Sequence, residues 1–443
     1  MVYFIASKGS VTAKNAVLLT LSCLFYAWGE PRFIFVLLAQ SLAAWLFGLL
    51  IEKYKKLGKE KKAGYLTACS VILTLSPLIF FKYADFFLFN LNLPLLGLVL
   101  PIGISFYTFQ ILSYTIDLYL SRIAVSRNII NFGAYVAMFP QLVAGPIVRY
   151  SEVEAALKER STTLDDVAQG ARRFVIGLAK KVLIANQMAV LAESVSRDSW
   201  LGVWLYALAF SFQIYFDFSG YTDMALGLGR IFGFKFPENF NYPYIAQSVT
   251  DFWRRWHISL SRWFRDYVYI PIGGSRVNFW RRVFNILAVW ALTGFWHGAA
   301  WNFIWWGLFF AVALVLEKNL KFLKLEKAPR VLKSVYLLLI VIIGWVIFDA
   351  PDMTQAIHNI LALFGIGVSE LWNLESLYYA RSYFILICVA IIGSTPLPKR
   401  CARFLLNKKI LVFIEPLALT ILLLACTAFL VDGSFNPFIY FRF

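Results

Sequence analysis

The sequence has few charged residues, since Lys, Arg, Asp and Glu together make up 15% of its 443 residues. Soluble domains carry about a quarter charged residues. Hydrophobic residues make up 60% of the chain, which leaves too little polar surface for an ordinary soluble domain. The composition therefore predicts a membrane protein.

Several kinds of catalytic motif are also missing. The chain has no G-x-S-x-G nucleophile elbow, no P-loop and no G-x-G-x-x-G run. It has only three histidines, His257, His297 and His358, and no HExxH, so we expect no catalytic metal. None of its five cysteines forms a CxxC pair and four lie in apolar stretches, which argues against disulfides, a zinc site and a redox role.

The apolar runs predict an all-α polytopic fold. A membrane-spanning helix needs about 20 mostly apolar residues. Candidate spans cover 15–28, 33–51, 65–82, 86–100, 102–120, 130–148, 174–194, 200–217, 283–294, 300–316, 334–350, 382–395 and 410–431. Some are too short or too polar to cross alone. We expect about 11 true spans, the others being re-entrant or interfacial, in one domain over 1–443.

The two ends of the chain carry their own expectations. The apolar run 16–28 ends without a small-residue cleavage site, so we expect no signal peptide but a shortened first span. Residues 1–12 should accordingly be poorly packed. The aromatic run 438–443 should lie at the outer membrane interface.

Basic residues exceed acidic ones by 42 to 25. They gather in short segments between apolar runs, the pattern of cytoplasmic loops, and not in a basic patch that would bind nucleic acid. We therefore expect no nucleic-acid partner. The predicted cytoplasmic segments are 52–62, 149–181, 254–282, 318–333 and 399–409, while 351–381 should face the outside.

The segment 283–317 has a basic segment at each end, so the chain must enter the membrane and return on the same side. Two full spans need about 40 residues plus a turn, and only 35 are present. The segment therefore predicts a hairpin that turns within the bilayer at 293–301, with His297 at or near its tip. Irregular backbone is tolerated at that depth only beside protein or a water-filled cavity.

His297 is the first candidate for catalysis, because an ionisable residue inside a membrane is a functional candidate by default. Gly294 and Gly298 flank it and allow close approach of backbone or substrate. Trp296 and Trp301 could wall a pocket around it. The alternative is a neutral histidine that bonds two helices together. His358 lies in an outer stretch and is expected to be a surface histidine.

His257 lies in the run WRRWHISLSRWFR (253–265), whose apolar residues recur at helical spacing. Four arginines lie off that stripe: Arg254, Arg255, Arg262 and Arg265. The pattern predicts an interfacial amphipathic helix with a basic face. That face could simply anchor the protein at the membrane surface, or it could hold the phosphates of an anionic cofactor at a cationic mouth. His257 would then have a direct or supporting catalytic role.

Two carboxylates interrupt the apolar span that begins at 200. Gln213 and Asp217 are four residues apart and share a helix face. Asp217 and Asp223 must be paired, protonated or in contact with water. They predict either a structural ion pair with a nearby arginine or the wall of a substrate tunnel.

These runs together resemble the membrane-bound O-acyltransferase family, in particular its bacterial branch of membrane subunits of alginate and related polysaccharide O-acetyltransferases. The resemblance runs from about residue 24 to the C-terminus and is strongest over 101–310. Besides the run at 253–265, its motifs are FYAWGEP (25–31), PIGISFYTFQ (101–110), FPQLVAGPI (139–147), FDFSGYTDM (216–224), PENFNYPY (237–244) and GFWHG (294–298). The IGGSR run at 272–276 and Asp223 look more like the acetyltransferases than like the related D-alanine-transferring members.

The resemblance implies that His297 is the catalytic histidine and that His257 matches a second position, often His or Asn. It implies a ring of helices around a central tunnel, in the inner membrane of a bacterium. Acetyl-CoA would be the donor from the cytosolic side, with no permanently bound cofactor. Membrane lipid and a separate periplasmic acetyltransferase acting on a polysaccharide would be the partners. In the alternative, the protein is a transporter or scaffold for polysaccharide export, with no chemistry of its own.

Overall fold

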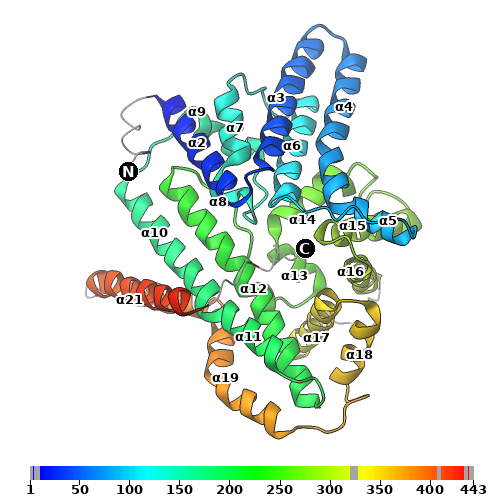
Figure 1. Ribbon diagram of the computed structural model, residues 1–443, viewed down its shortest axis with the longest axis vertical. Helices are drawn as coiled ribbons and strands as arrows, with labels where there is room; N and C mark the ends of the chain where they lie inside the picture. Colours follow the sequence, from blue (N-terminus) through cyan, green and yellow to red (C-terminus); the bar gives the residue numbers. More distant parts are fainter. Residues whose placement is uncertain (1–2, 4–9, 320–327, 407–410, 434–437, 439–443) are drawn as a thin grey trace. The chain divides into compact units, whose positions relative to one another are not determined.

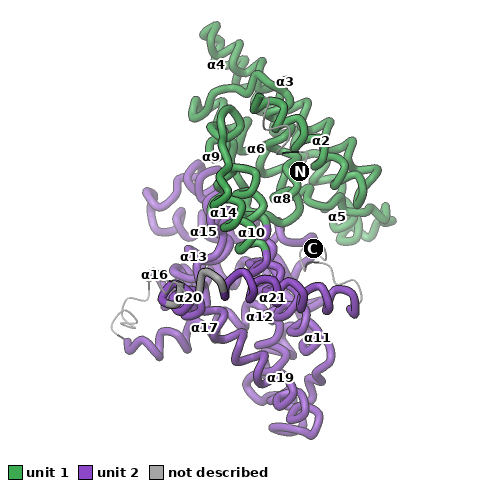
Figure 2. The backbone as a smooth tube through the Cα atoms, turned by 90° about the vertical axis from the view of Figure 1, so that its left-hand side faces the viewer, with its two compact units in different colours: residues 1–174, 225–237 green, residues 175–224, 238–443 purple. Residues whose placement is uncertain are grey.

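The structure is a computed structural model that describes residue 3 and residues 10–319, 328–406, 411–433 and 438 (Figure 1). All regular elements of this part of the chain are helical, apart from one isolated bridge between Ser199 and Glu370. The predicted all-α class is confirmed. The described residues form two compact units, one of 1–174 with 225–237 and the other of 175–224 with 238–443 (Figure 2).

The first unit is built around one buried helix. Its helices are α2 (Val11–Gly29), α3 (Ile34–Lys56), α4 (Glu60–Leu78), the π-helical η1 (Ile79–Tyr83), α5 (Ala84–Asn90), α6 (Ile104–Tyr119), α7 (Ile129–Ala137), α8 (Phe139–Leu142), α9 (Tyr150–Lys158) and the start of α10 (Leu164–Ala179). Nearly every side chain of α6 is buried, including Tyr107, Ile111 and Tyr114. Its buried residues include polar ones such as Gln110 and Asp117, and α6 packs against α3 and α4.

The second unit contains both histidines of interest. Its helices are η2 (Lys180–Ala185, π-helical), α11 (Asn186–Ser194), most of α12 (Trp200–Ile231), η3 (Pro243–Ile245), α13 (Val249–Arg255), α14 (Ile258–Phe264), η4 (Arg265–Tyr269), α15 (Phe279–His297), α16 (Trp301–Asn319), α17 (Arg330–Asp349), α18 (Met353–Leu363), α19 (Leu374–Gly393), α20 (Leu397–Leu406) and α21 (Leu411–Asp432). Large aromatic side chains of α12, α13, α16 and α17 fill its core, among them Phe216, Phe252, Trp306 and Trp345.

Nine helices of the described residues are long and apolar enough to cross a membrane, so the expected eleven is not confirmed. The candidate at 86–100 is not a helix beyond Asn90. Pro94 and Pro101 lack the N–H that a helix interior uses. The candidate at 130–148 is divided into α7 and α8. It contains Pro140 and Pro146, which also lack the N–H that a continuous helix would use.

The segment 149–181, predicted to be a cytoplasmic basic segment, overlaps the candidate span 174–194, and its residues from Leu164 onward are helical. The continuous run Leu164–Ser194, which joins α10, η2 and α11, is itself long and apolar enough to span. The helix therefore starts about ten residues before the predicted span, and Lys180 and Lys181 lie within it.

The structure describes only some residues at the two ends of the chain. Residues 1–2, 4–9 and 439–443 lie outside the described residues. Tyr3 is buried, against the expectation of poor packing at 1–12, and its hydroxyl donates to the Phe232 carbonyl at 2.6 Å. Ser10 caps the start of α2 by accepting a hydrogen bond from the Ala13 N–H. Phe438 packs on Tyr221 at a ring distance of 4.8 Å.

Candidate functional site

The predicted hairpin is formed by α15 and α16, and His297 is the last residue of α15. Asn278 caps the start of α15 by accepting a hydrogen bond from the Arg281 N–H at 2.9 Å. The two helices pack closely because glycine lies where their backbones meet. A methyl group on Gly294 would lie 2.1 Å from the Phe303 carbonyl oxygen, and one on Gly298 would lie 2.1 Å from the Phe303 ring. The two glycines therefore allow close approach of α15 to α16.

Aromatic rings surround the His297 imidazole. The centroid of Trp296 lies 5.0 Å away, that of Trp306 5.1 Å and that of Phe348 5.4 Å, all nearly perpendicular to the imidazole. The residue is 6% exposed. It also stands at the C-terminal end of a 19-residue helix, where the helix dipole stabilises a positive charge by about 0.3–1 kcal/mol. The position excludes bulk water from the ring.

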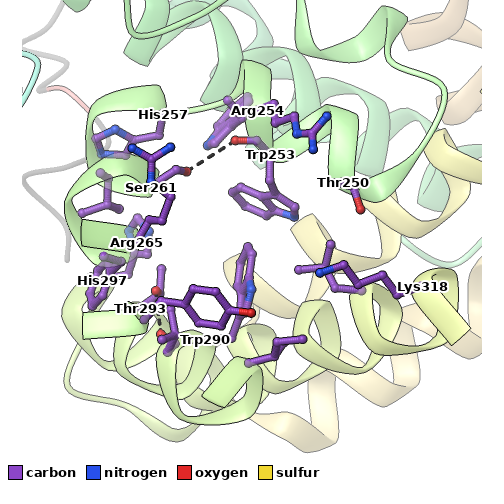
Figure 3. A pocket seen from close by; sticks show the side chains of 17 residues that line it. Thr250, Trp253, Arg254, His257, Ser261, Arg265, Trp290, Thr293, His297 and Lys318 are labelled. Atoms are coloured by element: carbon purple, nitrogen blue, oxygen red, sulfur yellow. Dashed lines mark hydrogen bonds between the residues drawn. The ribbon is translucent and has the colours of Figure 1, made fainter. Parts of the chain in front are cut away.

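A cavity of about 300 Å³ lies beside this histidine (Figure 3). Its wall includes His257, His297 and Thr293, the indoles of Trp253 and Trp290, and three basic side chains. The basic residues are Arg254 of α13, Arg265 of η4 and Lys318 of α16. In the view of Figure 3 the two histidines lie at the left and Lys318 at the right. Helices from separate parts of the sequence therefore build one cavity that combines imidazole, aromatic and cationic groups.

His257 occupies the turn between α13 and α14, in place of the single helix predicted for 253–265. Its backbone is left-handed, with φ +41° and ψ 55°. Asn239 anchors this turn, since its side-chain oxygen lies 3.2 Å from His257 Nδ1 and accepts from the Ser259 N–H at 3.1 Å. Phe218 packs edge-on against the imidazole at 4.6 Å. Burial lowers the pKa of His257 to about 3, because desolvation disfavours the charged form.

The four predicted arginines divide into two pairs. Arg254 and Arg265 line the cavity, although Arg265 also pairs with Asp266 at 2.7 Å. Arg255 is paired with Asp251 at 2.9 Å and is not part of the wall. Arg262 is exposed and is likewise not in the wall.

The residues predicted to line a tunnel lie apart from this wall. Trp296 is buried between the histidines, 6.1 Å from the His257 ring. Trp301 is 52% exposed at the start of α16. Gln213 is buried in α12. None of the three is among the residues that line the cavity.

The two carboxylates of α12 form ion pairs, as one alternative predicted, but with lysines and not with an arginine. Asp217 pairs with Lys181 in a buried contact, and Asp223 pairs with Lys180 at 2.6 Å. Neither aspartate is a wall residue.

Sequence reasoning missed Lys318 and Glu317 as parts of the site. Lys318 had been assigned only to a cytoplasmic basic cluster. Glu317 accepts hydrogen bonds from the Val249 N–H at 2.6 Å and the Thr250 N–H at 3.0 Å, so α16 holds the start of α13. A lone Glu-Lys pair at the end of an apolar span was the available signal. Its partners are some 70 residues away in the sequence, which only the fold reveals.

His358 is exposed on α18, as expected. Among the residues that the structure describes, no group of three or more His, Cys, Asp or Glu side chains could hold a metal ion.

The sequence was compared with protein families and with known proteins. Residues 119–351 match the membrane-bound O-acyltransferase family. The chain is 40% identical to the probable alginate O-acetylase AlgI of Azotobacter vinelandii, over 83% of this chain and 75% of that protein. It is 33% identical to the peptidoglycan O-acetyltransferase of Helicobacter pylori, over 89% and 83%, and 30% identical to the teichoic acid D-alanyltransferase of Bacillus subtilis, over 68% and 82%. The resemblance found in the motifs is confirmed, and the chain belongs to the membrane-bound O-acyltransferase family as a multi-pass O-acyltransferase.

Proposed function

We propose that the protein moves an acetyl group from cytosolic acetyl-CoA across the inner membrane of a bacterium, for O-acetylation of an extracytoplasmic polysaccharide, with His297 as general base. The observation that carries this proposal is the cavity, where His297 meets aromatic walls and basic side chains. The proposal goes beyond family membership in naming the donor, the acceptor class and the base.

The chemistry is acyl transfer from a thioester to a hydroxyl. The neutral His297 imidazole accepts the proton as the hydroxyl oxygen attacks the acetyl carbonyl. A new C–O bond forms, the C–S bond breaks, and the imidazolium returns the proton to the leaving thiolate. General base catalysis of this kind contributes about 10²–10⁴-fold, and the helix end at His297 favours the imidazolium that forms.

The cavity suits the thioester end of acetyl-CoA. Its volume of about 300 Å³ lies at the lower limit for ligand pockets, which is enough for an acetyl group and part of its carrier. Trp253 and Trp290 supply apolar surface, while Arg254, Arg265 and Lys318 supply charge that could hold phosphates outside the chemical centre.

The acceptor class follows from the relatives, whose names specify alginate and peptidoglycan. We expect a separate periplasmic acetyltransferase to complete transfer onto the polysaccharide. The paired basic segments predict that the Arg254 side of the site faces the cytosol.

Radiolabelled acetyl-CoA supplied to the purified protein tests the proposal. Label should pass to a hydroxyl acceptor or to the periplasmic partner with the wild-type protein, and not with His297→Gln. Transfer at the wild-type rate by His297→Gln, at equal protein in the membrane, would contradict the role of His297. If neither protein transfers label, while cells that produce either protein still export the polysaccharide, the scaffold alternative would be favoured.

A further inference from the structure

Asn239 makes four contacts to the turn that carries His257. Its backbone carbonyl accepts from the Ile258 N–H at 3.0 Å. Its side-chain oxygen accepts from the Ser259 N–H at 3.1 Å and from the Ser259 hydroxyl at 2.9 Å, and the same oxygen lies 3.2 Å from His257 Nδ1. Asn239 is fully buried. One residue thus anchors three consecutive residues of the site.

These contacts determine where the proton of His257 lies. A backbone N–H can only donate, so the Asn239 atom that faces Ser259 must be the oxygen and not the amide nitrogen. That oxygen is an acceptor, so a lone pair on His257 Nδ1 would face another lone pair. The contact is favourable only when Nδ1 carries a proton and donates.

We propose that Asn239 is a positioning residue that fixes His257 as the Nδ1-protonated tautomer, so that His257 serves the site through Nε2 as a neutral hydrogen-bond acceptor. The group that it would bind is an O–H or N–H donor, such as the acceptor hydroxyl or an amide of the acyl carrier. This role rests on the proposed acyl transfer, and it makes the supporting role of His257 specific.

The surroundings of the ring hold it in this state. Phe218 and Trp296 pack against it at 4.6 and 6.1 Å, which opposes rotation of the imidazole away from Asn239. Burial also disfavours a second proton on the ring. Neutral and of fixed tautomer, His257 can accept a hydrogen bond but has no mobile proton to give.

The backbone of His257 supports the same conclusion. A left-handed conformation is unfavourable for a residue other than glycine, and His257 adopts it at φ +41°. Such strain persists where the surrounding structure over-determines it, and it is concentrated at functional sites. The contacts of Asn239 to His257, Ile258 and Ser259 supply that constraint.

Nitrogen-15 NMR of the histidines tests the tautomer directly, because the chain has only three. Signals can be assigned by loss in His257→Ala, His297→Ala and His358→Ala. In the full-length wild-type protein we expect a protonated Nδ1 and an unprotonated Nε2 for His257 at pH 7. An Nε2-protonated ring or an imidazolium would overturn the proposal. This measurement needs no acetyl transfer, so it stands or fails separately from the proposed function.

Variants of Asn239 test the cause. Asn239→Asp keeps an oxygen at the anchoring position and should keep the Nδ1-protonated tautomer, whereas Asn239→Leu should lose it. Asn359→Leu is the matched control, because Asn359 is equally buried but lies on α18 and is not a wall residue. It should leave the His257 signals unchanged. An unaltered tautomer in Asn239→Leu would contradict the assignment.

A double-variant comparison shows whether Asn239 acts through His257. Loss of one hydrogen bond acceptor at the site is worth roughly 10–100-fold in kcat, so Asn239→Leu and His257→Ala should each lower kcat by that order. Together they should lower kcat no further than His257→Ala alone, because coupled residues are not additive. Fully additive losses would show that Asn239 serves the fold independently of His257, and would overturn the proposed role.

Discussion

The two buried histidines are the same residue type in opposite surroundings. Hydrogen bonds to Asn239 hold His257 in a strained turn between two seven-residue helices. Aromatic rings enclose His297 at the end of a 19-residue helix. A ring fixed by directional bonds is suited to orient a substrate, whereas a ring at a helix C-terminus is suited to gain and release a proton. In the proposed mechanism, the environment of each histidine, and not its residue type, distinguishes the two roles.

The largest expected effect separates the two histidines. His297→Gln keeps a polar side chain but cannot act as a base at neutral pH, so we expect kcat to fall by about 10²–10⁴-fold. Acetyl transfer measured per unit of protein in the membrane reports this loss. His358→Gln is the control and should retain wild-type turnover, since that side chain is exposed on α18. Substantial activity in His297→Gln would make the two histidines equivalent scaffolding groups.

A smaller loss is expected at the other histidine. His257→Ala removes a hydrogen-bond acceptor and not the base, so kcat should fall by roughly 10–100-fold. A loss as large as that of His297→Gln would indicate that His257 also transfers a proton, and would contradict the difference in role between the two histidines. The pH dependence of the remaining activity should stay that of wild type, because His257 does not titrate in the neutral range.

The adjacent arginines offer a matched pair around the same turn. Arg254 lines the cavity while Arg255 is paired with Asp251. Arg254→Ala should raise the KM for acetyl-CoA by about 10-fold, the value of one charge-assisted hydrogen bond, with kcat little changed. Arg255→Ala should leave KM near wild type. Equal changes in KM would show that the basic face acts as a diffuse charge.

The smallest expected effect is on stability against pH. In the unfolded chain an imidazole has a pKa near 6.5, whereas burial lowers that of His257 to about 3. Between these values the unfolded state binds more protons, so stability falls as pH drops below about 6.5, by at most about 1.4 kcal/mol per pH unit. Thermal midpoints in detergent between pH 7.5 and 5 measure this slope. His257→Asn should make stability less dependent on pH. An unchanged slope would show that other titratable groups cause the dependence.

The fold class and half of the site were predictable from local patterns. Apolar runs predicted the helices, and the 35-residue hairpin predicted His297 at the end of α15. The apolar stripe at 253–265 predicted a basic face of four arginines, of which Arg254 and Arg265 line the cavity, although the segment is two helices and not one. These signals are the spacing of apolar residues and the length of an apolar segment, and both can be read from a single sequence.

The rest depends on contacts between distant segments. The proximity of Glu317 and Lys318 to α13, and of Asn239 to His257, arises from tertiary packing that no local pattern encodes. Asn239 was visible within the PENFNYPY motif, but nothing in the sequence separated its role from that of its neighbours. The sequence predicts a span at 174–194 but also a cytoplasmic segment at 149–181, and the two overlap at Lys180 and Lys181. Only the fold shows that each of these lysines pairs with an aspartate of α12.

Those two lysine–aspartate pairs have a consequence for the biosynthesis of the protein. Each charge costs about 2.5–3.5 kcal/mol when its helix enters a bilayer alone. The runs that carry them, Leu164–Ser194 and Trp200–Ile231, are separated by only five residues. If the insertion machinery releases them as one hairpin, each helix meets its counter-charges before it meets lipid. Lengthening the connection at 195–199 should therefore delay membrane integration more than it weakens the finished protein.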